Sequence, residues 1–505
     1  MSVTNLIFLI NQVFAILAII HVVMDNRQPA KTMAWALVIY FIPFFGILAY
    51  IFFGVNTRRK RMVRRRTLDQ RTRSSLLKIE ETRSLPLPET HKPVVELFAS
   101  QSYALPLYAD KLSFMTDGYQ FFPSLLSDIA RAKSHIHIDI YIIEDDPLGQ
   151  LVSDALIDKA RQGVEVRIIY DDVGCWSVKN SFFDRMRREG IEIVPFLPVH
   201  FPRLTSKANY RNHRKIIVID GHTGYIGGMN IALRYVNGGK KKKKEQELGW
   251  RDTMARIEGL GTYSMQRAFL IDWYFASGTL IKDKKYYPPI GETDSGLAPT
   301  TANEQPPAPT ATGKQPPTAT NGPVLMQTVT SGPSSPFPEI MQGYVNIIMN
   351  AKRYIYIETP YFLPTSIVLF ALKTAVATGV DVRLLVPLHG DTWLTQWASR
   401  SYLREMAEAG VKVSLYRPAF LHSKLMVCDD CIATCGSTNI DFRSLENNFE
   451  ANTFFYGPEA ASQLRTIYLA DEQQSTDLTD LPSRMQPGFA VALWESLTRL
   501  FSPLL

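Results

Sequence analysis

The chain has 505 residues, of which 46% are hydrophobic and 20% charged, so it can form about two to four domains with a large core. A formal net charge of +7 and a pI near 9.0 favour an anionic partner: nucleic acid, anionic lipid or a phosphate substrate. Four cysteines exclude a disulfide scaffold at this length, and the cluster at Cys428, Cys431 and Cys435 lacks the second cysteine pair of a structural zinc site.

Two uncharged apolar segments open the chain, at residues 4–24 and 33–53. Each is about long enough to cross a bilayer, which takes ~20 apolar residues. We therefore predict a transmembrane hairpin over residues 1–57, with a buried hairpin in a soluble protein as the alternative. The first segment has no basic stretch before it and no small-residue cleavage site, so it does not read as a signal peptide.

A basic run at residues 58–66 begins the connecting segment 58–106. Basic flanks stay on the cytoplasmic side of a membrane, so we expect the N-terminus and the bulk of the chain to be cytoplasmic. A nucleic-acid patch is the rival interpretation of the run. Its place beside an apolar segment favours anionic headgroups, which attract each such charge by ~1 kcal/mol.

Residues 107–290 and 331–505 form two similar halves. The alternating strands 132–143 and 351–362 correspond, and residues 162–170 align closely with 378–386. The alternation of strands and helices predicts an α/β fold in which each half is a mixed β-sheet flanked by helices. In each half a helix ends at a glycine, which fits a left-handed cap at Gly190 and Gly410.

Two segments depart from this repeat. Residues 291–330 contain mainly Pro, Thr, Ala and Gly, which predicts a disordered linker between the halves. The run Lys240–Lys244 lies inside the first half and is expected to be a solvated loop, with a membrane-contacting loop as the alternative.

Each half carries one copy of the motif H-x-K-x4-D. The motif residues are His213, Lys215 and Asp220 in the first half and His422, Lys424 and Asp429 in the second. Because side chains alternate along a strand, the His and Lys of each copy point to the same face and can line one pocket. The Asp belongs to the same catalytic motif but faces away from the Lys, so we expect salt bridges or turn contacts from it.

A glycine-rich turn follows each motif, with Gly228 and Asn230 in the first half and Ser437 and Asn439 in the second. Small residues let backbone amides approach a phosphate, and the asparagines add amide donors. Farther along lie two acids, Asp252 and Glu450. We expect each to orient an imidazole, as in other nucleophile–base–orienter sets, with surface or capping acids as the alternative.

These residue types suit metal-free chemistry on a phosphodiester. One His can attack phosphorus while the other protonates the leaving oxygen, because an ordinary His pKa of about 6.5 allows both roles. Preorganised donors such as the lysines stabilise the charge that grows on the phosphate oxygens, at about 3 kcal/mol each in comparable cases. The sequence presents no acidic metal cage, so neither a metal nor a cofactor is predicted.

The duplicated motif resembles the phospholipase D superfamily, and the whole chain is similar to bacterial cardiolipin synthases. Further segments carry the similarity: Ala34–Trp35, Trp250–Asp252, Thr359–Pro364, Asn439–Ser444, Asn448–Glu450 and Phe501–Leu505. The resemblance implies two pseudo-symmetric phospholipase D-like domains in one chain. The lysine run and the long linker depart from the family pattern.

The resemblance also implies a reaction. A phosphatidyl group passes from one phosphatidylglycerol to a His, and then to a second phosphatidylglycerol, giving cardiolipin and glycerol. Superfamily habit favours His213 as the nucleophile, although the symmetry of the motifs leaves His422 open. The implied partners are phosphatidylglycerol and anionic lipids rather than nucleic acid, at the bacterial inner membrane with several membrane passes. The oligomeric state stays open.

Alternatives remain at this stage. The same site could hydrolyse phospholipids or use another acceptor; a nucleic-acid phosphodiesterase and an inactive membrane scaffold are further possibilities. The C-terminal stretch from Ala490 is amphipathic, and it fits a helix lying on a bilayer as well as a helix packed into the core.

Overall fold

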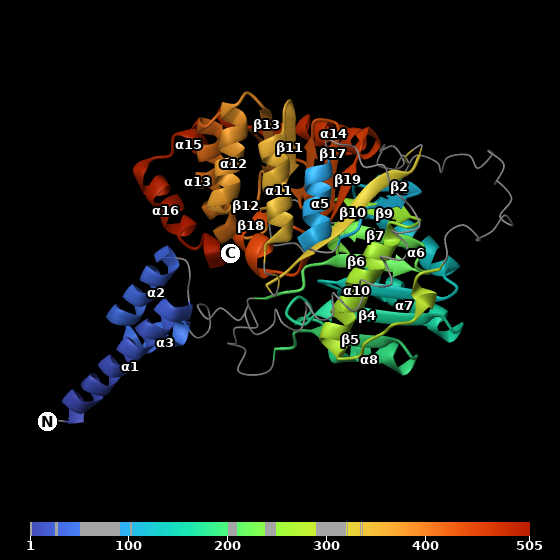
Figure 1. Cartoon of the computed structure of the whole chain (residues 1–505), viewed down its shortest axis with the longest axis horizontal. Coiled ribbons are helices and arrows are strands. Elements are labelled where there is room, and N and C mark those ends of the chain that lie inside the picture. The colour runs from blue at the N-terminus through green and yellow to red at the C-terminus, as the bar shows by residue number, and fades with distance from the viewer. Residues whose placement is uncertain are drawn as a thin grey trace.

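The computed structural model describes residues 3–25, 29–50, 91–101, 104–199, 210–237, 249–288, 320, 322–333, 335 and 337–504. Three predicted features lie outside the described residues: the basic run 58–66, Lys240–Lys244 and most of the segment 291–330. Figure 1 shows two α/β bodies side by side, with the N-terminal helices standing apart from them.

The N-terminal segment folds into α1 (Val3–Asp25), α2 (Pro29–Phe41) and α3 (Pro43–Ala49). The described part of the predicted second span, residues 33–50, is divided between two helices, because the helix breaks at Ile42, whose φ and ψ are −134° and 67°, before Pro43. Gly46 allows α3 to fold against α2, since a Cβ there would lie 2.7 Å from the Val38 carbonyl oxygen. Among the described helices, none combines the length and apolar character required to cross a bilayer.

The first half contains a seven-stranded mixed sheet. In spatial order its strands are β2 (Lys111–Met115), β9 (Met254–Glu258), β7 (Thr223–Gly227), β6 (Lys215–Ile219), β3 (His135–Ile140), β4 (Glu165–Asp171) and β5 (Glu192–Phe196). Its main helices are α6 (Gly118–Arg131), α7 (Pro147–Arg161), α8 (Asn180–Arg188) and α10 (Thr262–Ser277). Strands β3, β4 and β5 are parallel, and the others pair antiparallel.

The second half repeats this order in a nine-stranded sheet. Its strands are β1 (Leu107–Ala109), β10 (Val324–Ser331), β19 (Glu450–Tyr456), β17 (Ile432–Gly436), β16 (Leu425–Cys428), β11 (Tyr354–Glu358), β13 (Asp381–Pro387), β14 (Lys412–Tyr416) and β20 (Ser475–Asp477). Its main helices are α11 (Glu339–Asn350), α12 (Ser366–Ala377), α13 (Trp393–Glu408), α14 (Pro458–Glu472) and α16 (Phe489–Arg499). The predicted α/β fold with two mixed sheets is confirmed, and Gly190 and Gly410 adopt the predicted left-handed conformation.

Two boundaries differ from the prediction. Strand β10 (Val324–Ser331) begins inside the predicted disordered linker 291–330, so the second half starts before residue 331. Strand β1, at the start of the predicted first half, pairs with β10 and so belongs to the second sheet. Helix α5 (Lys92–Gln101) also packs on that half, and Gln327 of β10 donates to the carbonyls of Val95 and Ala104. Strand β1 therefore covers the edge of β10, which would otherwise expose unpaired backbone groups.

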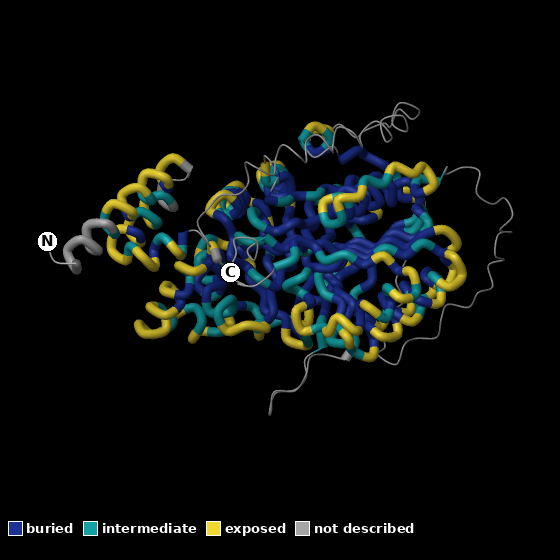
Figure 2. Tube along the Cα trace, turned by 90° about the horizontal axis from the view of Figure 1, so that it is seen from below, coloured by how far each residue is buried: buried dark blue, intermediate teal, exposed yellow. Residues whose placement is uncertain are grey.

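The two sheets share a core. The apolar residues that follow each H-x-K, including Ile216 and Val218 in β6 and Leu425 and Val427 in β16, belong to one buried cluster that spans both halves. Helices α10 and α14 contribute to the same cluster through Met265 and Leu464, among others. Figure 2 shows buried residues concentrated in the interior of the two bodies, whereas the N-terminal helices are largely exposed. The halves therefore form one unit in which the two motifs meet.

Candidate active site

Short backbone pairings between the halves position the two histidines. The His213 N–H donates to the Phe449 carbonyl at 2.9 Å, next to an isolated bridge between Asn212 and Phe449. In the other direction, the His422 N–H donates to the Arg251 carbonyl at 2.7 Å, beside the parallel pair β8 (Trp250–Arg251) and β15 (Phe420–Leu421). Each histidine is thus placed against the residue that precedes a carboxylate of the opposite half.

Each carboxylate consequently contacts the histidine of the other half. His213 Nδ1 lies 3.1 Å from Glu450 Oε1 and 3.1 Å from the Ser437 carbonyl oxygen. Because that carbonyl can only accept, Nδ1 carries the proton, which leaves Nε2 with a free lone pair. His422 Nδ1 lies 2.6 Å from Asp252 Oδ2. Both predicted orienting acids therefore contact an imidazole, and each serves the histidine of the other half.

Both histidines line one cavity of about 360 Å³. Its other lining residues include Asn230 and Asn439, the aromatic residues Tyr141, Tyr235, Trp250 and Tyr361, and the polar residues Arg211, Arg234, Asp441, Arg443 and Asn448. Aromatic rings flank the imidazoles: the ring centroid of Tyr141 is 4.9 Å from His213, and that of Trp250 is 4.8 Å from His422. These rings restrict the imidazoles to the orientation that the carboxylates select.

Both motif lysines are buried beside the histidines. Lys215 Nζ donates to the His213 carbonyl at 2.6 Å and lies 5.0 Å from the Tyr141 ring centroid. Lys424 Nζ lies 2.8 Å from His422 Nδ1 and 3.7 Å from Asp252 Oδ2. Burial lowers the pKa of Lys215 to about 7 and that of Lys424 to about 8, and Lys424 also repels Lys215. An anion in the cavity would favour both charged forms.

The histidines are neutral near pH 7 in the free protein. Burial lowers the pKa of His213 to about 4, opposed by Glu450, and burial together with Lys424 lowers that of His422 to about 3. Burial alone would raise the pKa values of Asp252 and Glu450. The lysine and histidine beside each acid have the larger effect and hold both pKa values below their ordinary values. The site therefore combines ionised acids with neutral imidazoles.

The motif aspartates lie outside the lining of this cavity. Asp220 accepts the backbone N–H groups of Lys133, Ser134 and His135 at 2.7–2.9 Å. Asp429 accepts those of residues 352, 353 and 354 at 2.6–2.8 Å. Their inclusion among the catalytic residues is corrected: the turn contacts expected from strand geometry are what the structure contains. Each Asp holds the beginning of the strand that pairs with its motif strand.

The small residues after each motif serve the carboxylates. A Cβ at Gly228 would lie 2.1 Å from Asp252 Oδ1, and the Gly228 N–H donates to the Thr253 carbonyl. Ser437 donates its hydroxyl to Glu450, and its N–H donates to the Ala451 carbonyl at 2.9 Å. The expected approach of these backbone amides to a phosphate is therefore wrong. The turn instead makes space for the acid and holds it.

The two asparagines line the cavity with different partners. Asn230 accepts the Ile142 N–H at 3.0 Å and donates to the Tyr235 hydroxyl at 2.8 Å. The side chain of Asn439 lies near Asp441 and lowers the pKa of that acid, which burial raises to about 6. Sequence reasoning assigned no role to Trp250, Arg443 or Asn448, although all three lie in segments that carried the family resemblance. Tyr141 and Tyr235 had no sequence signal, because only the folded cavity brings them to the histidines.

Two further buried acids lie at equivalent positions near the histidines. Asp139 of β3 accepts from Asn212, the residue before His213, at 2.6 Å. Glu358 of β11 interacts with Ser423, the residue after His422. Burial and a second acid raise the pKa of Asp139 well above its ordinary value and that of Glu358 to about 8. Glu358 is therefore neutral near pH 7 and adds no negative charge to the site, and burial beside a second acid favours the neutral form of Asp139 as well.

The chain is similar to known proteins over nearly its whole length. The sequence profile described as "Cardiolipin synthase, PLD-like domain" matches residues 125–251 and 344–471, and that described as "Phospholipase_D-nuclease N-terminal" matches residues 13–54. A cardiolipin synthase of Geobacillus thermodenitrificans is 35% identical over 490 residues, covering 95% of this chain and 90% of that protein. The major cardiolipin synthase ClsA of Bacillus subtilis is 35% identical over 512 residues, covering 99% of this chain and 98% of that protein.

A solved structure supports the fold. The phosphatidylserine synthase of Haemophilus influenzae Rd KW20 superposes with a TM-score of 0.60 at 16% sequence identity. The alignment covers 83% of this chain and all of that protein. At this identity the likeness concerns the arrangement of the two α/β bodies.

Proposed function

The chain belongs to the phospholipase D-type cardiolipin synthase family, as its motifs predicted, and we propose that it transfers a phosphatidyl group between two phosphatidylglycerol molecules. The products are cardiolipin and glycerol. The observation that carries this proposal is that His213 and His422 line one cavity, each with Nδ1 held by a carboxylate. This arrangement leaves two Nε2 atoms for chemistry on one phosphate.

In the first step, one His Nε2 forms a bond to phosphorus, and the bond between phosphorus and the glycerol oxygen breaks. The other His, as imidazolium, gives its proton to that oxygen, and glycerol leaves. Burial lowers the pKa of both histidines, so negative charge near them favours the imidazolium. A bound phosphodiester supplies that negative charge, so substrate binding prepares the acid.

In the second step, the acid has become a base. It removes the proton from a terminal hydroxyl of a second phosphatidylglycerol, whose oxygen attacks phosphorus and releases the nucleophilic His. Lys215 and Lys424 stabilise the charge on the non-bridging oxygens in both steps. We take His213 as the nucleophile, and Asp252 and Glu450 keep the imidazoles in the reactive tautomer and stabilise their cationic forms.

We further infer a bacterial cell-membrane location, with the N-terminal helices as a multi-pass anchor and both catalytic halves cytoplasmic. Exposed apolar side chains on these helices support it, among them Phe14, Leu17, Phe44 and Phe45. Digestion of intact spheroplasts with an external protease should leave the catalytic halves intact. Cleavage within them before lysis would refute the orientation.

The function is tested with the full-length protein in proteoliposomes containing phosphatidylglycerol labelled in its headgroup glycerol. The expected products are labelled glycerol and cardiolipin in equal amounts. A phospholipase D hydrolase would release the same glycerol but would leave phosphatidic acid and no cardiolipin. A His213→Asn/His422→Asn double variant gives the background.

A further inference from the structure

Helix α16 packs against the protein with its polar side. Glu495 and Thr498 are buried, and Glu495 forms an ion pair with Arg404 of α13 at 2.8 Å. The opposite side is apolar and exposed: Phe489 (84%), Leu493 (49%), Trp494 (44%), Leu497 (43%) and Leu500 (74%). A surface helix of a soluble protein normally buries its apolar stripe. The apolar side of α16 is therefore not packed into the core, which was one of the two interpretations that the sequence left open.

The apolar surface continues to the rim of the catalytic cavity. Trp393, which is 61% exposed, stacks on Trp494 with ring centroids 6.4 Å apart and an interplanar angle of 12°. Its neighbours Thr392 and Thr395 both line the cavity that holds the histidines. An apolar chain lying along α16 would therefore extend to the rim of the catalytic cavity.

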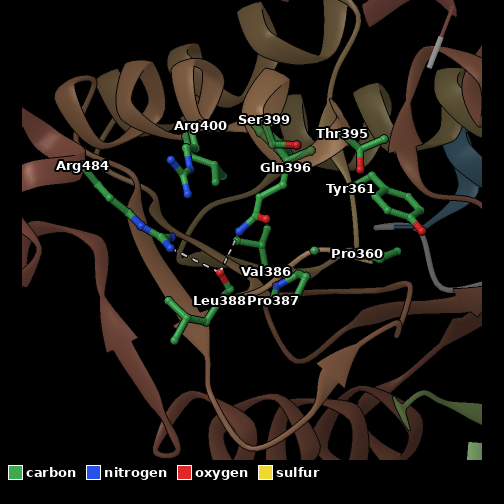
Figure 3. A pocket seen from close by; sticks show the side chains of 13 residues that line it. Pro360, Tyr361, Val386, Pro387, Leu388, Thr395, Gln396, Ser399, Arg400 and Arg484 are labelled. Carbon is green, nitrogen blue, oxygen red and sulfur yellow. Dashed lines mark hydrogen bonds between the residues drawn. The ribbon is translucent and has the colours of Figure 1, made fainter. Parts of the chain in front are cut away.

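A small pocket next to this surface contains two arginines, Arg400 of α13 and Arg484 of α15 (Pro482–Met485). Figure 3 shows both guanidinium groups directed toward the same space, with Arg484 donating to the Leu388 carbonyl at 3.3 Å. The pocket shares Tyr361 and Thr395 with the catalytic cavity. It therefore adjoins the site of phosphoryl transfer.

The pair lacks negative charge. Within the described part of the chain, neither arginine takes part in an ion pair, and Arg400 Nε is buried without a hydrogen-bond partner. Glu495 is the acid that favours their charge, and it is already bonded to Arg404. Burial lowers the pKa of both guanidinium groups, and Arg400 also repels Arg484. A phosphate would supply the missing charge and the fork-shaped hydrogen bonds that arginine favours.

We propose that Arg400 and Arg484 bind the phosphate of a second anionic phospholipid, whose acyl chains lie along the exposed side of α16 and on Trp393. The inference rests on the proposed function, in which this lipid is the acceptor phosphatidylglycerol. The adjoining apolar surface favours a lipid over free phosphate. Because the arginine pocket and the catalytic cavity share residues, the acceptor's terminal hydroxyl, one glycerol unit from its phosphate, can enter the cavity. Water then competes poorly for the phosphatidyl-histidine.

The first test compares Arg400→Gln/Arg484→Gln with wild type in proteoliposomes of phosphatidylglycerol. The ratio of cardiolipin to phosphatidic acid should fall about tenfold or more, because loss of a charge-assisted bond costs at least ~1.4 kcal/mol. Glycerol release, which needs only the donor lipid, should change less. Arg465→Gln is the matched control, since Arg465 pairs with Asp430 and lines neither pocket. An unchanged ratio in a folded double variant overturns the proposal.

The second test does not depend on catalysis. Brominated phosphatidylglycerol in proteoliposomes should quench wild-type tryptophan fluorescence more than it quenches Trp393→Phe/Trp494→Phe. It should also quench more than brominated phosphatidylcholine does, and Arg400→Gln/Arg484→Gln should abolish that lipid preference. Equal quenching by both lipids refutes the anion site, and quenching that follows protein density instead assigns the surface to a second copy. If wild type makes no cardiolipin while the lipid preference persists, the proposed reaction fails and the lipid site stands.

Discussion

Asp252→Asn is the most direct probe of a carboxylate that contacts the histidine of the other half. The change keeps the shape of a fully buried side chain whose Oδ2 lies 2.6 Å from His422 Nδ1, and it removes one negative charge. When His422 becomes cationic during the reaction, the lost attraction at about 4 Å is ~4 kcal/mol for an effective dielectric constant of about 20. At 1.36 kcal/mol for each factor of ten, we expect kcat to fall by about 10³.

The assay is cardiolipin formation from labelled phosphatidylglycerol, with thermal unfolding measured on the same samples. Asp220→Asn is the matched control, since Asp220 accepts three backbone N–H groups outside the cavity lining. It should lower stability by about 1–3 kcal/mol and leave kcat per folded molecule unchanged. The reasoning is refuted if Asp252→Asn keeps kcat within tenfold of wild type, or if both variants lose activity equally at equal stability.

Three further outcomes are expected. The kcat/KM for lipid should fall as pH rises from about 7 to above 8, because Lys215 loses its charge near pH 7 and Lys424 near pH 8 in the free enzyme; a profile flat to about pH 10 would contradict this. Because the pKa of Glu358 is raised to about 8, the folded protein retains a proton that the unfolded chain loses, so stability falls from about pH 4.5 to pH 8. Glu358→Gln should reduce the drop in Tm between about pH 6 and pH 9; an undiminished drop would argue against a neutral acid. After an alkaline quench, labelled phosphatidyl group should be found on His422→Asn and be absent from His213→Asn, and the reverse pattern would make His422 the nucleophile.

Much of the site follows from local pattern. His and Lys two residues apart on a strand share a face. Both motif histidines line the cavity as predicted, whereas Lys215 and Lys424 are buried beside them, outside its lining. The same period placed Asp220 and Asp429 away from the lysines, and both make turn contacts. The duplication predicted two related sheets, because each half carries the same alternation of strands and helices. Tyr141 and Tyr235 were not predicted, because only the folded cavity brings them next to the histidines.

The sequence by itself determined the two α/β halves, the paired histidines and lysines, and the acids Asp252 and Glu450, because these depend on residue type and on the short periods of strands and helices. Only the tertiary structure decided that each acid serves the opposite half, that β1 joins the second sheet and that α16 turns its apolar side outward. The physical reason is separation along the chain: Glu450 lies 237 residues from His213, and they meet through backbone bonds between the halves that no local pattern encodes.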